Sequence, residues 1–334
     1  MSQQRKILYD ISSRSWEHPA DRAALETLRK IPALDAMLQR VFGNTSERSL
    51  RLMHLASTVR VSERQFSRLH ALFGEACQIM DIERPELFVA QSPFLNAGAV
   101  GMDRPFIVLN SSIIQNLDDE ELLGVMGHEL GHILSGHVLY KTLLGILVRF
   151  SQFFIRIPIG DMAISGLIIA LNEWSRKSEL SADRAELLTV QNPDVPIRAL
   201  MKMAGGGQVD QMHLGEFLEQ AEEYNSSDSI QDNLFKILNV LNQSHPFAVV
   251  RVAELLKWVQ SGEYDRIRQG EYTRRAEDAD IFEDYKSAAE TYRKDFRETT
   301  RPLDSVWQAA EDGVQGAAKR AKDIMEGFFG PRET

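Results

Sequence analysis

The stretch that decides the fold lies at residues 118–134 and reads DDEELLGVMGHELGHIL. Asp118 is typical of a helix N-cap, and Glu121 three positions later completes a capping-box pattern. Apolar residues then recur at helical spacing, so we expect a helix that continues to about Tyr140. The middle of this helix carries an HExxH pattern at residues 128–132.

The HExxH spacing has a physical reason. Residues four apart lie within about 40° of each other around a helix, so the imidazoles of His128 and His132 project from one face. Two such nitrogens can occupy two corners of a tetrahedral zinc site, and Glu129 lies beside the metal, where it can hold a water. Chance produces this pattern in roughly one chain per hundred of this size. The alternative is a helix with two surface histidines, and a third ligand would decide between them.

Glu179 is the best candidate for that third ligand. It begins the segment ELSADR, in which Glu179 and Asp183 share one helical face. A carboxylate at 179 would complete a His₂Glu site, and Asp183 could accept a hydrogen bond from the far nitrogen of a ligating histidine. Two carboxylates at this spacing are also typical of a solvated helix face.

A nearby histidine does not fit the site on this argument. On a continuous helix, His137 lies about 180° around the axis from His128, so we expect it to face away from the metal. A metzincin pattern would require Gly at 135 and His at 138, where the chain has Ser135 and Val138.

These segments together resemble the HtpX-like and CAAX-prenyl-endopeptidase family of gluzincin zinc metallopeptidases. The resemblance rests on four blocks in family order, which cover roughly residues 86 to 260. The blocks are LGVMGHELGH at 123–132, ELSADR at 179–184, Ser244-His245-Pro246 followed by Arg251, and Asn96-Ala97-Gly98-Ala99 followed by the 106–109 strand.

The resemblance implies a role for each matching residue. It implies one zinc ion per chain held by His128, His132 and Glu179, with Glu129 as the general base and Asp183 behind a ligating histidine. It further implies that His245 stabilises the oxyanion, that Arg251 supports this part of the site, and that Asn96, Ala97, Gly98 and Ala99 form a substrate-binding edge strand. Gly98 stands where the family often has an aromatic residue, and a charged helical segment replaces the family's membrane hairpin before the motif.

The remaining sequence predicts an α+β fold that is mostly helical, a zincin-type domain with a small mixed sheet and an HExxH active-site helix. Short apolar runs at 86–90, 96–100 and 105–109 predict strands, and the first eighty residues predict helices, with Leu52, Leu55 and Val59 on one apolar stripe. We expect an N-terminal helical segment at 1–84, a metallopeptidase domain at 85–260 and a charged helical extension at 261–334.

Composition narrows the function classes. The 334 residues contain 38 Lys and Arg against 48 Asp and Glu, a net charge of −10, which argues against nucleic acid as a partner. The single cysteine, Cys77, excludes an intrachain disulfide and predicts a reducing, cytoplasmic location. Residues 1–14 lack the apolar core of a secretory signal, and the longest charge-free apolar stretch, 162–172, is shorter than a membrane span.

Two segments leave alternatives open. The apolar hairpin expected at 138–174 would either be buried, against the protein or across a homo-oligomer interface, or dock peripherally on a membrane. The apolar stripe at 302–330 would either pack on the protein or cover the zinc site. We therefore predict a zinc-dependent endopeptidase acting on proteins or peptides. The alternative is a non-catalytic interaction or membrane-surface protein with a structural zinc site.

Overall fold

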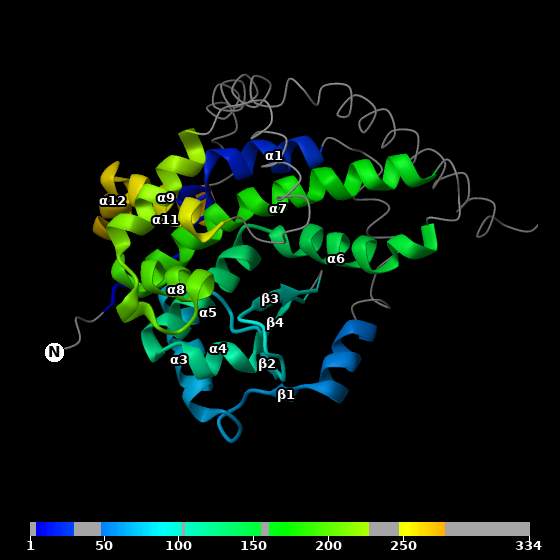
Figure 1. Ribbon diagram of the computed structural model, residues 1–334. Coiled ribbons are helices and arrows are strands. Elements are labelled where there is room, and N and C mark those ends of the chain that lie inside the picture. Colours follow the sequence, from blue (N-terminus) through cyan, green and yellow to red (C-terminus); the bar gives the residue numbers. More distant parts are fainter. Residues whose placement is uncertain (1–4, 30–47, 102–103, 155–159, 227–246, 278–334) are drawn as a thin grey trace, which may run out of the picture.

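The computed structural model describes residues 5–29, 48–101, 104–154, 160–226 and 247–277, and within them helices predominate around one small sheet (Figure 1). The helices are α1 (Pro19–Arg29), α3 (Ser67–Ile79), α4 (Ser111–Asn116), α5 (Asp119–Leu134), α6 (His137–Phe154), α7 (Gly160–Val190), α8 (Asp194–Gly205), α9 (Leu214–Ser226), α11 (Ala248–Gln260) and α12 (Glu263–Gln269). The strands are β1 (Val59–Arg60), β2 (Glu86–Ala90), β3 (Ala97–Val100) and β4 (Phe106–Asn110). The predicted α+β, mostly helical fold is confirmed.

The sheet is mixed and has the order β1-β2-β4-β3. β2 and β4 run parallel, whereas β1 and β3 are antiparallel to their neighbours, with Ala97 opposite Leu109 and Val100 opposite Phe106. The three predicted strands are therefore present within one residue at each end. β3 lies at an edge of the sheet and has β4 as its one strand neighbour.

Both faces of the sheet are covered. One face contributes Leu87, Val89, Ile107 and Leu109 to the main core, and the other gathers Phe88, Phe106 and Val108 into a smaller cluster. A helix over residues 48–57 lies against this smaller cluster, where the ring of His54 meets that of Phe106 edge to face at 5.1 Å.

One residue of the expected helical stripe lies elsewhere. Val59 pairs with Val89 in β1 instead of extending the helix, so its assignment to a helix is wrong. The two stripe residues on the helix itself, Leu52 and Leu55, are exposed. The helix contacts the sheet through other side chains, such as His54. The apolar stripe therefore does not mark the residue at which the helix ends.

Helices α5 and α7 pack very closely, because glycine lines the contact. A Cβ added to Gly131 would lie 2.5 Å from Cβ of Ala185, and one added to Gly127 would lie 2.9 Å from Cγ2 of Thr189. Side chains at these positions would hold the helices apart. The glycines of the LGVMGHELGH block therefore set the short distance across which residues of the two helices meet.

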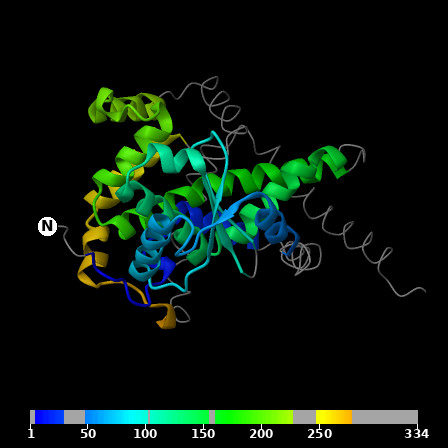
Figure 2. The same cartoon turned by 90° about the horizontal axis from the view of Figure 1, so that it is seen from below.

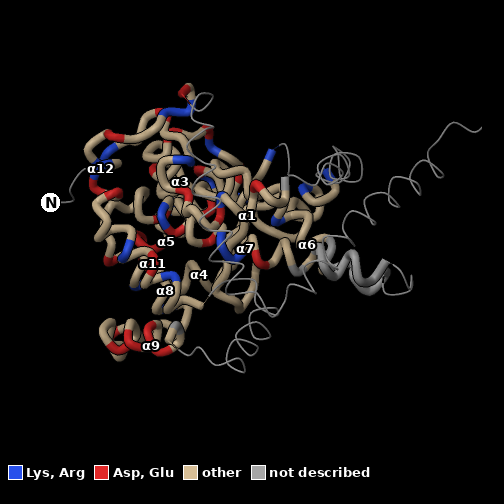
Figure 3. The backbone as a smooth tube through the Cα atoms, turned by 90° about the horizontal axis from the view of Figure 1, so that it is seen from above, with Lys and Arg blue, Asp and Glu red and all other residues tan. Residues whose placement is uncertain are grey.

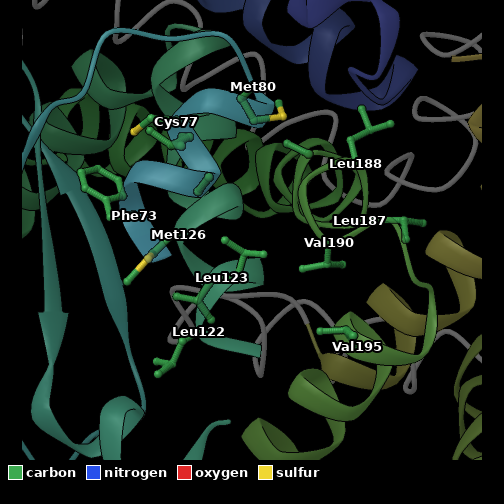
Figure 4. Packing of buried hydrophobic residues seen from close by; sticks show 14 of the residues in the cluster. Phe73, Cys77, Met80, Leu122, Leu123, Met126, Leu187, Leu188, Val190 and Val195 are labelled. Carbon is green, nitrogen blue, oxygen red and sulfur yellow. The ribbon is translucent and has the colours of Figure 1, made fainter. Parts of the chain in front are cut away.

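The main core joins distant parts of the chain. Figure 4 shows Phe73 and Cys77 of α3 in one cluster with apolar side chains from α5 and α7. Trp16 near the N-terminus and Tyr264 of α12 belong to the same cluster, and Ser12 donates its backbone N–H to the carbonyl of Thr273 at 2.9 Å. The proposed division of the chain at residues 84 and 260 stays a prediction.

The apolar hairpin consists of α6 and α7, which run side by side and extend past the sheet (Figure 2). Its half nearest the sheet is buried, because Tyr140 and Leu143 of α6 and Trp174 of α7 pack with Leu25 and Leu28 of α1. Within the described ranges, no helix combines the length and apolar content needed to cross a bilayer. The side chains between 149 and 167, and the tail at 302–330, lie outside the described residues.

Charge is spread over the molecule. Figure 3 shows basic residues scattered among several helices, whereas α9 is strongly acidic, with Glu216, Glu219, Glu222 and Glu223 in one helix of 13 residues. Phosphate-backbone binding generally needs a stripe or patch of basic residues. Among the described residues the basic side chains are scattered, and the absence of a nucleic-acid partner stays a prediction.

Candidate metal centre

The helix that carries the HExxH pattern begins as predicted and ends earlier than predicted. The side chain of Asp118 accepts the N–H of Glu121 at 2.9 Å, and Glu121 accepts the N–H of Asp118 at 2.9 Å, which completes the capping box. The helix ends at Leu134, where Gly136 takes a φ of +68° that favours glycine. The expected continuation to Tyr140 is therefore wrong.

This early end changes the position of His137. His137 begins α6 rather than continuing α5, so the 180° angle that assumed one helix does not apply. Its Nδ1 lies 3.0 Å from Nδ1 of His132, and its ring is fully buried. The expectation that His137 faces away from the site is wrong.

Three predicted ligands converge. Nε2 of His128 lies 3.3 Å from Oε2 of Glu179, and Nε2 of His132 lies 3.3 Å from Oε1 of the same carboxylate. One donor atom from each of these three residues lies within 4.8 Å of the other two, and all three side chains are buried. Two imidazoles and a carboxylate are a ligand set that zinc enzymes use, with a fourth position left for water.

A lysine side chain reaches two of these donors. Nζ of Lys141, on α6, lies 3.0 Å from Nε2 of His132 and contacts Oε1 of Glu179. The carboxylate and the imidazole thus already have a cationic group as their neighbour. The arrangement therefore fits a cation of the kind that imidazole and carboxylate bind.

A carboxylate stands behind the first histidine. Oδ1 of Asp183 lies 3.2 Å from Nδ1 of His128, on the side of the ring opposite Glu179. Arg251, from α11, donates from Nε to Oδ2 of Asp183 at 2.8 Å and from Nη2 to Oδ1. Arg251 also lies 3.7 Å from Glu179, so one guanidinium supports both carboxylates.

Burial and charge set the ionisation of these groups. Burial lowers the pKa of His128, but hydrogen bonds to Asp183 and Glu179 outweigh it and raise this pKa to about 10. Burial and the positive charge of Lys141 lower the pKa of His132 well below its ordinary value. Burial raises the pKa of Asp183, yet the charge of Arg251 lowers it overall. The carboxylates thus make the site attractive to positive charge.

Glu129 points to the edge of the sheet. Its Oε2 accepts the backbone N–H of Ala99, in β3, at 2.7 Å. Burial raises the pKa of Glu129 above its ordinary value, with the charge of His128 acting in the opposite direction. A raised pKa makes a carboxylate a stronger base than an ordinary glutamate.

Glu186 is an additional buried acid beside the site. Its Oε2 lies 3.7 Å from Nδ1 of His128, and its Oε1 has no hydrogen-bond partner among the described residues. Burial raises the pKa of Glu186 to about 7. His128, Asp183 and Glu186 form a second group of possible ligand atoms, on the far side of the imidazole.

The remaining predicted site residues lie at the edge of the sheet or outside the described residues. The substrate-binding residues Ala97, Gly98 and Ala99 lie in β3, and Asn96 precedes it and accepts the N–H of Asn110 at 3.0 Å. A Cβ on Gly98 would meet no atom within 4 Å, so space is open beside the strand. His245 lies outside the described residues.

Sequence reasoning missed Lys141, the position of His137, and Asp21 of α1, whose Oδ2 lies 3.0 Å from Nε2 of His137. Nothing local marks Lys141 or Asp21, because each reaches the site from a helix distant in sequence or separated by a turn. The signal for His137 was Gly136, since a glycine directly after an apolar helix commonly ends it.

Comparison with known proteins bears on this geometry. Residues 63–259 match the model of peptidase family M48. The chain is 36% identical over 264 residues to the plastoglobule-localized metallopeptidase 48, chloroplastic, of Arabidopsis thaliana, an alignment that covers 77% of this chain and 76% of that protein. It is 29% identical over 191 residues to protease HtpX homolog 1 of Streptomyces coelicolor, covering 49% and 63%.

A third relative agrees with these. Protease HtpX homolog 2 of Methanosarcina mazei is 25% identical over 224 residues, covering 60% of this chain and 75% of that protein. No solved structure matches the chain significantly.

Proposed function

The chain belongs to peptidase family M48, which includes the HtpX zinc metallopeptidases, and we propose that it cleaves internal peptide bonds at one zinc ion. His128, His132 and Glu179 would hold this ion. The observation that carries the proposal is the meeting of both Nε2 atoms with the carboxylate of Glu179, beside the carboxylate of Glu129.

The zinc ion would supply Lewis acidity to the scissile carbonyl and acidify water. Glu129 takes a proton from the attacking water and later delivers it to the leaving amine. Its raised pKa supports the first half of this exchange, because a carboxylate with a pKa far below neutral pH would take the proton poorly. The resemblance to the family implies that His245 would stabilise the oxyanion.

The substrate would bind as an extended strand along β3. The N–H of Ala99 is donated to Glu129 rather than to β4, which means that the open edge of the strand faces this carboxylate. A peptide that paired with this edge would pass the general base directly. Main-chain pairing of this kind gives affinity for proteins and peptides with little selectivity for side chains.

Thr142 ties α6 to the end of this strand. Its Oγ1 donates to the carbonyl of Gly101 at 3.1 Å, directly after β3. The contact places Lys141, the preceding residue, at the same end of the edge. α6 thus forms a wall of the proposed substrate groove, and peptide length beyond this end would be limited by it.

Glu129→Gln tests the assignment of the base. The variant keeps the shape of the side chain but cannot take a proton, so we expect peptide cleavage to fall by about 10²–10⁴-fold. Zinc content, measured by elemental analysis, should remain near that of the unchanged protein. Cleavage of a quenched peptide is measured with and without a chelator, and added zinc should restore the chelated enzyme.

The matched control is Glu120→Gln, an exposed glutamate on the same helix. It should cleave the peptide at the normal rate. A Glu129→Gln variant with near-normal cleavage would refute the base assignment, and an unchanged protein that binds no zinc would refute the site. Bound zinc without Glu129-dependent cleavage would favour the structural-zinc alternative.

The location of the chain stays a proposal. One named relative is from chloroplast plastoglobules, and cytoplasmic residence, peripheral membrane contact through 138–174 and self-association are expectations for this chain. Sedimentation with anionic lipid vesicles would test the membrane contact, and sedimentation without them would test self-association.

A further inference from the structure

The two metal-binding histidines are supported in different ways. Nδ1 of His128 faces Asp183 directly at 3.2 Å, whereas Nδ1 of His132 faces another imidazole, that of His137, at 3.0 Å. Nε2 of His137 in turn lies 3.0 Å from Oδ2 of Asp21, on α1. The two atoms are close but not aligned as a hydrogen bond, and this buried nitrogen has no hydrogen-bond partner among the described residues. A second carboxylate thus stands behind the second histidine, one ring removed.

Asp21 is firmly held. Its side chain is 1% exposed, and it accepts Nε1–H of Trp174 at 3.0 Å and Oγ–H of Ser181 at 2.5 Å. Burial raises the pKa of Asp21, but the contact with His137 and these hydrogen bonds lower it below its ordinary value. The carboxylate therefore remains charged and oriented.

The ring of His137 is also packed against two other rings. It meets the ring of Trp174 at 5.6 Å and that of His132 at 5.2 Å, both edge to face. With the ring fixed, the remaining freedom is which nitrogen carries the proton.

Only one placement of protons serves metal binding. If His132 carries its proton on Nδ1 and donates it to Nδ1 of His137, then Nε2 of His132 keeps the lone pair that a metal needs. His137 then carries its proton on Nε2, which faces the carboxylate of Asp21. The opposite placement would turn a lone pair of His137 toward the carboxylate and put the proton of His132 on the ligand atom. A charged carboxylate at this position favours the first placement.

We propose that Asp21 acts through His137 to set the tautomer and orientation of His132, which makes helix α1 part of the metal site. The proposal rests on the proposed function, because it assigns a role toward the same zinc ion. Residue 21 precedes the residues 63–259 that match the family model. Asp21 and His137 are positioning residues, since neither one reaches the donor atoms.

The test measures zinc affinity by competition with a fluorescent chelator in the full-length protein. In Asp21→Asn, an amide group replaces one of the two carboxylate oxygens that Trp174, Ser181 and His137 face. His137→Leu removes the nitrogen that faces Nδ1 of His132. We expect each to weaken zinc binding by about 10–100-fold, as loss of such partners typically does. His137→Gln retains an acceptor and a donor and should recover most of the affinity.

Spectra and stability separate positioning from folding. We expect the cobalt-substituted Asp21→Asn protein to show an altered d–d absorption spectrum. A merely structural role would lower the unfolding midpoint of the metal-free protein and leave the affinity of the folded molecules and the cobalt spectrum unchanged. Glu26→Gln, on the same helix, is the control and should match the unchanged protein in all three measurements.

A measurement without substitution covers the case in which the variants do not fold. Long-range ¹H–¹⁵N NMR of the zinc-loaded protein should find His132 protonated at Nδ1 and His137 protonated at Nε2. A proton on Nδ1 of His137, or unchanged affinity in folded Asp21→Asn and His137→Leu, would overturn the proposal. Absence of zinc binding by the unchanged protein would instead overturn the proposed function.

Discussion

Replacing Gly131 by alanine should separate α5 from α7 and weaken metal binding more than it weakens the fold. The new Cβ would lie 2.5 Å from Cβ of Ala185, whereas ordinary contact begins at about 3.4 Å. The helices must therefore move apart by about 0.9 Å, the difference between these distances. Metal–ligand distances tolerate about 0.2 Å, and Glu179 lies on the helix that moves.

The magnitudes follow from the same contact. Overpacking of this kind costs about 1–3 kcal/mol, and the better helix propensity of alanine offsets about 1 kcal/mol of it. We expect urea unfolding of the metal-free protein to show a net loss of about 0–2 kcal/mol. Zinc affinity, from chelator competition, should fall by about 100-fold or more, the upper end of the effect of losing a supporting group.

Two further variants make this reasoning refutable. Ala185→Gly in the Gly131→Ala background removes the overlapping atom, and the next neighbours of the new Cβ lie at ordinary distances of 3.5 and 3.8 Å, so zinc affinity should return. Gly145→Ala, on α6, meets no atom within 4 Å and should stabilise the protein by about 0.5–1 kcal/mol. Zinc affinity of Gly131→Ala within about 2-fold of normal, or no recovery in the double variant, would contradict the argument.

Three other outcomes are expected. Arg251→Met should lower the free energy of unfolding by about 3–5 kcal/mol, because Asp183 loses its buried partner, and a urea titration showing under about 1 kcal/mol would contradict this. Hydrogen bonding from His18 lowers the pKa of Glu254 to about 2, so this contact stabilises the fold above about pH 4.5 and the stabilisation is lost as the pH falls toward 2. Glu254→Gln should lower the free energy of unfolding by about 1 kcal/mol or less at pH 7. Near pH 2 the variant and the unchanged protein should be equally stable. Burial raises the pKa of Cys77 to about 12, so a maleimide at pH 8 should label the thiol after unfolding and leave the folded protein unlabelled.

Local patterns predicted most of the fold and the outline of the site. The capping box at Asp118, the three strands and the juxtaposition of His128 with His132 all depend on residues within a few positions of one another. The pairing of Glu179 with both histidines was predicted by adding a family resemblance to helical spacing, and its role as a ligand stays a prediction.

The errors have separate physical origins. The angle assigned to His137 assumed an unbroken helix, and Gly136 at positive φ breaks it. Val59 shares a helical period with Leu52 and Leu55, yet backbone pairing with Val89 decides its conformation. Asp21 reaches the site through packing of α1 on α7, a long-range contact that no periodicity within α1 reports.

The guanidinium that neutralises Asp183 comes from residue 251, 68 positions further along the chain. During synthesis, the HExxH helix and Glu179 therefore emerge from the ribosome well before their counter-charge does. Until α11 arrives, the carboxylate of Asp183 next to His128 lacks its strongest partner, so the geometry of the site lacks this support. Translation itself would thus delay proteolytic competence until α11 has emerged.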